Sequence, residues 1–186
     1  DIRLTSFEMS RSVIQGLTDA GADVIDIGQS GTEEIYFATA HLGVDGGICV
    51  TASHNPKDYN GMKFVREGSK PISGDTGLKD IQRIAEENNF AEVTSKGTLT
   101  EQNIGADYIE HLLTYVKKEN LKPLKIVCTA GNGGAGAVID DIESKLPFEW
   151  VKVHHEADGN FPNGVPNPLL EENRAPTIQA IKDSGA

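Results

Sequence analysis

Short apolar runs alternate with segments of helical periodicity along the whole sequence, and this alternation constrains the fold more than any other feature. Strands are predicted at residues 22–27, 46–50, 124–129 and 150–154. Helices are predicted at residues 6–20, 32–42, 76–88, 106–119 and 135–146, and a last helix begins at Thr177. Strands and helices in this order build βαβ units, so we expect mainly parallel sheets covered by helices on both faces.

The composition limits the class of protein. Of the 186 residues, 38% are hydrophobic and 24% are charged, as is typical of a soluble globular protein. The formal net charge of −11 argues against a nucleic-acid partner, which needs a basic surface. No segment is long and apolar enough to suggest a membrane span, and none resembles a signal peptide. The two cysteines, Cys49 and Cys128, lie inside predicted strands, and two buried thiols indicate the reducing cytoplasm.

A polar loop between two predicted strands holds the residues best suited to chemistry. One apolar strand ends at Val50, and apolar alternation resumes at Met62, so residues 51–61 form the loop. Ser53 and His54 lie within it, and loops at strand ends are where open α/β sheets bind ligands. The Asn-Pro and Asn-Gly dipeptides equally fit an ordinary structural turn. A serine-hydrolase site is disfavoured, because there is no Gly-x-Ser-x-Gly elbow.

Two glycine-rich stretches have less specific patterns. Residues 130–136 connect a predicted strand to a helix, which is the setting of a phosphate or dinucleotide site. The Gly-x-Gly-x-x-Gly register and the Lys-Ser/Thr of a Walker loop are missing, so a tight connection is favoured. Residues 158–168 place Asp158, Asn160 and Asn163 as in a calcium loop, but the downstream glutamate is misplaced. An ordered loop at a domain edge is the better interpretation.

The periodic pattern lapses into polar residues and threonines between residues 90 and 103, which predicts a domain boundary. We expect a first domain at residues 1–103 and a second at residues 104–186. The predicted fold class is α/β, with two consecutive three-layer αβα domains that have mixed, mainly parallel sheets.

Several strings resemble the α-D-phosphohexomutases, the superfamily of phosphoglucomutases, phosphomannomutases and phosphoglucosamine mutases. Thr-Ala-Ser-His-Asn-Pro at residues 51–56, followed by Asp-Tyr-Asn-Gly-Met-Lys, is similar to the phosphoserine loop of that superfamily. Ala-Gly-Asn-Gly at 130–133 and Asp-Gly-Asn-Phe-Pro-Asn-Gly at 158–164 are similar to its second-domain signatures. Gly-Thr-Glu-Glu-Ile-Tyr-Phe-Ala-Thr at 31–39 looks most like bacterial phosphomannomutases of capsule and lipopolysaccharide sugar pathways. The resemblance covers essentially the whole chain.

The resemblance implies roles for five residues. Ser53 would carry the phosphoryl group exchanged with the sugar, and that phosphate would bind Mg²⁺. His54 and Lys63 match neighbouring catalytic positions; a histidine can hold a hydroxyl proton and a lysine cation suits a phosphate oxyanion. Asn55 and Arg3 are the implied substrate-binding residues, and the Asp-Ile-Arg string that holds Arg3 resembles the family's second Asp-x-Arg.

The resemblance implies an enzyme, an intramolecular phosphotransferase of the isomerase class. It would interconvert mannose 6-phosphate and mannose 1-phosphate through a phosphoserine and a bound bisphosphate. The alternatives are a phosphoglucomutase, a phosphoglucosamine mutase or a non-catalytic sugar-phosphate-binding module. A hexose phosphate is the expected partner, nucleic acid and membrane are not, and the sequence leaves sugar preference and oligomeric state open.

Members of the superfamily have four domains around a deep cleft. Their Asp-Gly-Asp-x-Asp-Arg metal loop, sugar-reading loop and C-terminal phosphate-binding domain are absent from this sequence. We therefore expect a fragment in which both domains are incomplete and which is inactive alone, with the other Mg²⁺ ligands outside it.

Overall fold

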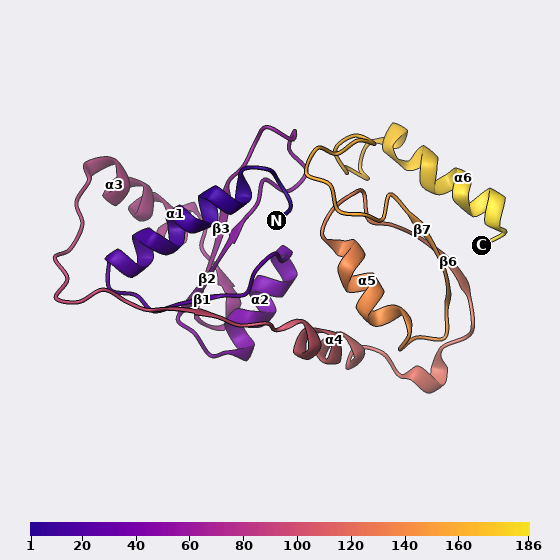
Figure 1. The fold of residues 1–186 in the computed structure, drawn as a ribbon, viewed down its shortest axis with the longest axis horizontal. Coiled ribbons are helices and arrows are strands. Elements are labelled where there is room, and N and C mark those ends of the chain that lie inside the picture. The colour runs from indigo at the N-terminus through magenta and orange to yellow at the C-terminus, as the bar shows by residue number, and fades with distance from the viewer. The chain divides into compact units, whose positions relative to one another are not determined.

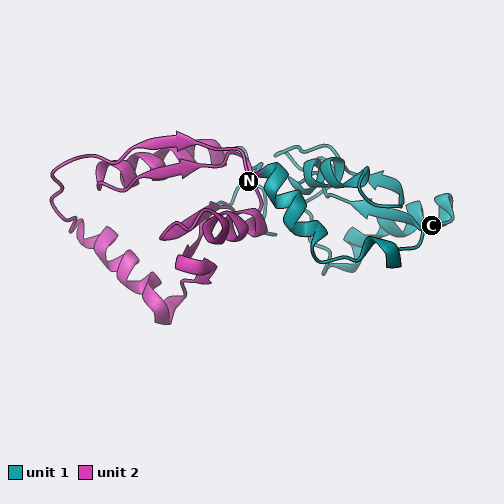
Figure 2. Ribbon diagram, turned by 90° about the horizontal axis from the view of Figure 1, so that it is seen from below, with its two compact units in different colours: residues 1–4, 52–60, 105–186 teal, residues 5–51, 61–104 magenta.

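The computed structural model describes residues 1–186, and the chain divides into two compact units (Figure 2). Unit 1 comprises Asp1–Leu4, Ala52–Asn60 and Gly105–Ala186. Unit 2 comprises Thr5–Thr51 and Gly61–Ile104. The chain therefore passes between the units several times, and the loop with Ser53 belongs to a different unit from the strands on either side of it.

Unit 2 contains an antiparallel sheet with the strand order β2-β3-β4. Its strands are β2 (Gly46–Val50) and β3 (Met62–Arg66), both labelled in Figure 1, and the two-residue β4 (Lys70–Pro71). Helix α2 (Thr32–His41) packs on this sheet at close range, because a Cβ on Gly47 would lie only 2.2 Å from the Thr39 hydroxyl oxygen. Only glycine permits this separation of helix and strand.

The remaining strands of unit 2 differ from the expectation. β1 (Val24–Asp26) pairs in parallel with β5 (Leu99–Glu101), a strand that the polar stretch at residues 90–103 does not predict, and it lies in a different sheet from β2. The Asp23 carboxylate accepts hydrogen bonds from the backbone N–H and the hydroxyl of Thr98, at 2.8 and 2.7 Å. This pairing depends on backbone groups and one polar side chain, which hydrophobic periodicity does not detect.

Helix α1 (Ser6–Asp19) confirms the prediction for residues 6–20, but the helix predicted at 76–88 begins later. A π-helical turn, Gly74–Leu78, precedes α3 (Lys79–Glu87), because Gly77 has a φ of 131° that a regular helix does not allow. The helical spacing of its apolar residues predicts a buried stripe, and this prediction is wrong. Leu78, Ile81 and Ile84 are each more than a third exposed, at 39%, 39% and 38%.

The C-terminal part of unit 1 is built on two parallel strands, β6 (Lys125–Thr129) and β7 (Glu149–Val153). Helices α5 (Ala135–Glu143) and α6 (Ala175–Ser184) lie on opposite sides of this pair (Figure 1). Helix α4 (Gly105–Leu113) packs against α5 and is shorter than predicted, because the N–H and hydroxyl of Thr114 both bond the His111 carbonyl and end it in a turn. Single 3-10 turns occur at Glu67–Ser69, Lys118–Asn120 and Glu171–Arg174.

The two strand-helix-strand regions confirm the predicted α/β class; the strands form two parallel pairs and one three-stranded antiparallel sheet. None of the helices combines the length and the apolar character needed to cross a lipid bilayer.

Candidate active site

The loop Ala52–Asn60 leaves β2 and returns to β3 as two consecutive turns. The N–H of Thr51 bonds the Gly61 carbonyl at 2.9 Å and closes its base. Asn55 donates from both its N–H and its side-chain amide to the Ala52 carbonyl, at 3.0 and 2.8 Å. Ser53 is exposed and has a φ of 54°, a left-handed conformation that is uncommon for a residue with a side chain. Such backbone conformations persist only where the surrounding contacts enforce them, and they gather at functional sites.

Arg3 provides those contacts. Its guanidinium donates four hydrogen bonds to backbone carbonyls of the loop: Nη1 to Pro56 and Tyr59, at 2.7 and 3.0 Å, and Nη2 to Ser53 and Asn55, at 2.9 and 2.8 Å. The Arg3 residue is only 2% exposed. A planar fork with five N–H donors fits this set of carbonyls, which a single ammonium group does not. Arg3 therefore shapes the backbone around Ser53.

The surroundings of Arg3 balance its burial. Burial lowers the pKa of the guanidinium, and the nearby charge of Asp58 opposes that shift. The Asp1 carboxylate lies 3.6 Å from Nε, and the guanidinium stacks over the Phe161 ring at 5.5 Å from its centroid. Phe161 belongs to the Asp-Gly-Asn-Phe-Pro-Asn-Gly string, so Arg3 joins the serine loop to one of the second-domain motifs.

The two glycine-rich motifs form one hydrogen-bonded structure around Asn132, which is 6% exposed. Its side-chain amide donates to the Glu156 carbonyl at 2.8 Å, and its side-chain oxygen accepts from the Asn163 amide at 2.9 Å. Its own N–H bonds the His154 carbonyl at 2.7 Å. Residues 130–136 are therefore a tight strand-to-helix connection, as predicted, and Asn132 is a structural residue that the sequence pattern alone does not single out.

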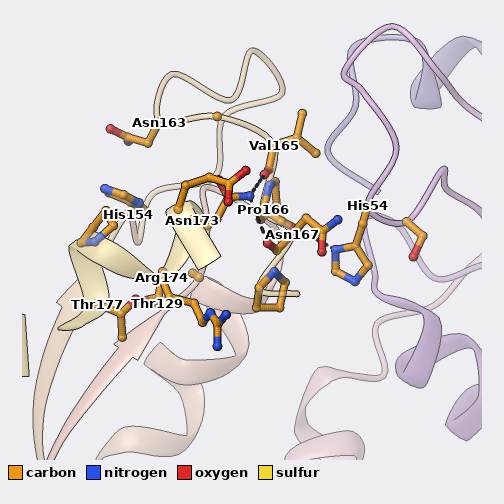
Figure 3. A pocket seen from close by; sticks show the side chains of 17 residues that line it. His54, Thr129, His154, Asn163, Val165, Pro166, Asn167, Asn173, Arg174 and Thr177 are labelled. Carbon is orange, nitrogen blue, oxygen red and sulfur yellow. Dashed lines mark hydrogen bonds between the residues drawn. The ribbon is translucent and has the colours of Figure 1, made fainter. Parts of the chain in front are cut away.

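His54 lies at the edge of a pocket of about 420 Å³ within unit 1 (Figure 3). Its Nδ1 is 2.5 Å from the Pro166 carbonyl oxygen, and the imidazole remains exposed. In Figure 3, His54 lies on one side of the pocket, and Thr129, His154 and Thr177 lie on the other. Ser53 also lines the pocket, so a ligand there would contact the predicted catalytic serine.

Lys63 lies in unit 2, on β3, where it is paired across the ladder with Cys49. Its Nζ donates a hydrogen bond of 3.2 Å to the hydroxyl of Thr32, the first residue of α2. Ser53, His54, Asn55 and Arg3 all belong to unit 1. Thr32 is not among the predicted site residues, because a threonine after a glycine indicates only the start of a helix.

The chain contains no group of three or more His, Cys, Asp or Glu side chains that could hold a metal ion. Residues 1–186 therefore do not fit a Mg²⁺ site built from their own side chains, and Ser53 remains the one predicted ligand, through its phosphate.

Both cysteines are free thiols, and burial raises the pKa of each.

Two family models match consecutive parts of the chain. Residues 1–92 match the family model for phosphoglucomutase/phosphomannomutase, alpha/beta/alpha domain I. Residues 106–186 match the model for domain II of the same family. The chain belongs to the phosphoglucomutase/phosphomannomutase family, and the resemblance to the phosphohexomutases is confirmed.

The sequence is similar to several bacterial phosphomannomutases and phosphohexose mutases. The chain is 58% identical over its whole length to the phosphomannomutases of Vibrio cholerae and of Escherichia coli strain K12, and covers 41% and 42% of them. It is 52% identical to proteins called phosphohexose mutases in Xanthomonas campestris. The chain thus spans about two fifths of the length of these relatives.

Solved structures agree on the fold. A phosphoglucomutase/phosphomannomutase family protein from Burkholderia thailandensis has a TM-score of 0.89 at 35% identity, over 99% of this chain and 41% of its own. A structure from Thermus thermophilus has a TM-score of 0.77 at 22% identity, over 97% of this chain and 41% of its own, which supports the fold alone.

Proposed function

We propose that residues 1–186 form the phosphoserine-bearing part of a phosphomannomutase, which interconverts mannose 6-phosphate and mannose 1-phosphate. The observation that supports this most strongly is the exposed, left-handed Ser53 on a loop that Arg3 holds by four hydrogen bonds. The names of the most similar relatives point to the same activity.

The proposed reaction is two phosphoryl transfers of opposite direction. In the first, the bond between phosphorus and Ser53 Oγ breaks, a bond to a sugar hydroxyl oxygen forms, and the hydroxyl proton leaves for a base. The resulting bisphosphate then returns its other phosphate to Ser53. Such transfers depend on positioning and on stabilising charge on the equatorial oxygens. Lys63 would stabilise the transferring group or move the hydroxyl proton, and His54 would orient the sugar hydroxyl.

Asn55 and Arg3 have supporting roles in this proposal. The Arg3 guanidinium already bonds four loop carbonyls, so we assign it to shaping the Ser53 backbone beside its predicted role in substrate binding. The side-chain amide of Asn55 bonds the Ala52 carbonyl, which stabilises the turn and leaves its oxygen as an acceptor for a sugar hydroxyl. The phosphate on Ser53 is the only ligand proposed for Mg²⁺, and no step here depends on the metal ion.

Two broader proposals accompany the activity. The domain boundary is placed between residues 103 and 104, which is compatible with family matches at 1–92 and 106–186. A cytoplasmic location is proposed because Cys49 and Cys128 are both free thiols.

Ser53→Ala in the full-length protein tests the activity directly. Phosphorus NMR measures the formation of mannose 1-phosphate. In the Ser53→Ala variant this product should fall below detection, because the loop has lost the serine hydroxyl that accepts the phosphoryl group. Ser12→Ala is the matched control, since Ser12 is exposed on α1 and bonds only the Glu8 carbonyl of its own helix. Substantial turnover by the Ser53→Ala variant would refute the assignment.

The second candidate function, a non-catalytic sugar-phosphate-binding module, is supported by the 420 Å³ pocket beside Ser53. Peptide mass spectrometry after incubation with Mg²⁺ and a hexose 1,6-bisphosphate separates the two. The mutase leaves a phosphate on Ser53 and a binding module does not. Turnover of glucose and glucosamine phosphates by the full-length protein would distinguish phosphoglucomutase and phosphoglucosamine mutase from the mannose enzyme.

A further inference from the structure

The Lys63 side chain is held by a hydroxyl group from another element. A lysine side chain has four rotatable bonds and about 2 kcal/mol of rotamer entropy, so an unrestrained ammonium samples many positions. In unit 2 the β2–β3 ladder fixes its backbone opposite Cys49, and the Thr32 hydroxyl accepts a 3.2 Å hydrogen bond from its Nζ. Both ends of the side chain are therefore restrained.

Thr32 is itself held in place. It is the first residue of α2. The Glu34 carboxylate caps the N-terminus of this helix by accepting a 2.7 Å hydrogen bond from the Gly31 N–H. The Thr32 hydroxyl oxygen also lies 3.9 Å from the sulfur of Cys49, which is 1% exposed. A β-branched side chain has few rotamers in a helix, so the hydroxyl has a defined position.

The chemistry of this partner differs from that of an ion pair. Glu33 and Glu34 lie in the first turn of α2, and burial raises the pKa of the Glu34 carboxyl. Burial also raises the pKa of the Cys49 thiol, so this group is neutral at neutral pH. The partial positive charge of a helix N-terminus does not attract an ammonium, so the hydroxyl is the feature that explains its position. A carboxylate partner would neutralise the lysine, whereas a hydroxyl leaves its charge available for a phosphoryl group.

A threonine hydroxyl can bond a lysine nitrogen in both of its protonation states. It accepts a hydrogen bond from the ammonium form of lysine and donates its own hydrogen to the neutral amine. The same partner can therefore hold the Lys63 nitrogen in place before and after a proton moves.

We propose that Thr32 is a positioning residue for Lys63: its hydroxyl holds the lysine nitrogen in one place without neutralising its charge. The catalytic consequence rests on the proposed mutase function, while the link between the two side chains does not. Thr32 acts through Lys63 and is not itself a catalytic residue.

Kinetics of the full-length protein test the catalytic consequence. Thr32→Val removes the hydroxyl at nearly constant volume and should lower kcat about tenfold while KM changes less than about twofold, the pattern of an interaction used mainly in the transition state. Thr32→Ser keeps the hydroxyl and should restore kcat to near the wild-type value. Thr39→Val is the matched control on the same helix, because the Thr39 hydroxyl bonds only the Ile35 carbonyl at 2.8 Å, and its kcat should be unchanged.

A double-mutant cycle separates positioning from general stability. If Thr32 acts through Lys63, Thr32→Val should have no further effect on kcat in a Lys63→Ala background. An equal loss in both backgrounds, or a failure of Thr32→Ser to restore kcat, would overturn the proposal.

Acylation of the Lys63 amine tests the link without any turnover. Limited reaction of the full-length protein with acetic anhydride, followed by peptide mass spectrometry, should show Lys63 modified several-fold faster in Thr32→Val, because the nitrogen loses its hydrogen-bond partner. Thr32→Ser and Thr39→Val should react like the wild type. If the rates change but the wild type lacks mutase activity, the proposed function fails and the positioning stands; equal acylation rates in all four proteins would refute the positioning itself.

Discussion

Replacing Arg3 with lysine should destabilise the loop Ala52–Asn60, which holds Ser53. Lysine keeps the positive charge but offers one nitrogen in place of the planar fork, so it cannot reach the four carbonyls that Arg3 bonds at 2.7–3.0 Å. The stacking of the guanidinium over Phe161 is lost as well.

The size of the effect follows from this geometry. A hydrogen bond to a charged group contributes about 1.5–3 kcal/mol to stability, and four are at stake. Two effects reduce the total: the loop is exposed, so water can reach released carbonyls, and a buried cation loses hydration. We therefore expect Arg3→Lys to lower the free energy of unfolding by about 3–5 kcal/mol, the range for breaking a buried charged network.

Urea unfolding monitored by circular dichroism measures the free energy of unfolding of the whole protein. Hydrogen exchange at the backbone amides of Asn55 and Tyr59 measures the local stability of the loop. Exchange at both amides should accelerate, because their turns lose the guanidinium. Arg83→Lys is the matched control: Arg83 is 54% exposed on α3 and pairs with Glu87 at 3.0 Å, so its replacement should change stability by less than about 0.5 kcal/mol. An Arg3→Lys protein with the stability of the control and unchanged loop exchange would refute this role for Arg3.

Two further predictions concern the packing of glycines in helices and the charge of Asp140. Gly136→Ala should lower stability by about 1–3 kcal/mol, because the new Cβ would lie 2.3 Å from the His155 carbonyl oxygen. Gly16→Ala in α1, where no atom lies within 4 Å of a new Cβ, should raise stability by about 0.5–1 kcal/mol, and thermal unfolding compares the two; equal shifts would contradict the packing argument. The hydrogen bond from Lys152 lowers the pKa of the Asp140 carboxyl, so its contribution to stability is present above the ordinary carboxyl pKa and lost as pH falls through the lowered folded value. Asp140→Asn should therefore reduce the melting temperature at pH 7, and the difference from the wild type should shrink as pH falls below the ordinary carboxyl pKa; a difference that stays constant with pH would exclude this mechanism.

Local residue patterns were sufficient to predict several elements. The polar loop between Val50 and Met62 follows from apolar alternation on both of its sides, and the structure confirms the two flanking strands, β2 and β3. Residues 130–136 were predicted as a strand-to-helix connection, and Asn132 is the residue that holds it. These features depend on neighbours in the chain, which periodicity and turn residues report directly.

Other features depend on partners far apart in the chain. β5 forms because Thr98 and the residues after it meet β1 about 75 residues earlier, and nothing in a threonine-rich stretch reveals that pairing. The apolar stripe of α3 has helical spacing, yet it stays more than a third exposed, since periodicity specifies a face and not what covers it.

Short strings and the alternation of strands and helices are sufficient to predict the α/β class and the family, and they also locate the loop that holds Ser53, because this information lies in neighbouring residues. Only the tertiary structure assigned Arg3 to the loop backbone and Thr32 to Lys63. Arg3 lies 50 residues before Ser53, and Thr32 lies 31 residues before Lys63. A hydrogen bond requires two atoms within about 3 Å, and for residues so distant in the chain that proximity is decided by the packing of the whole fold.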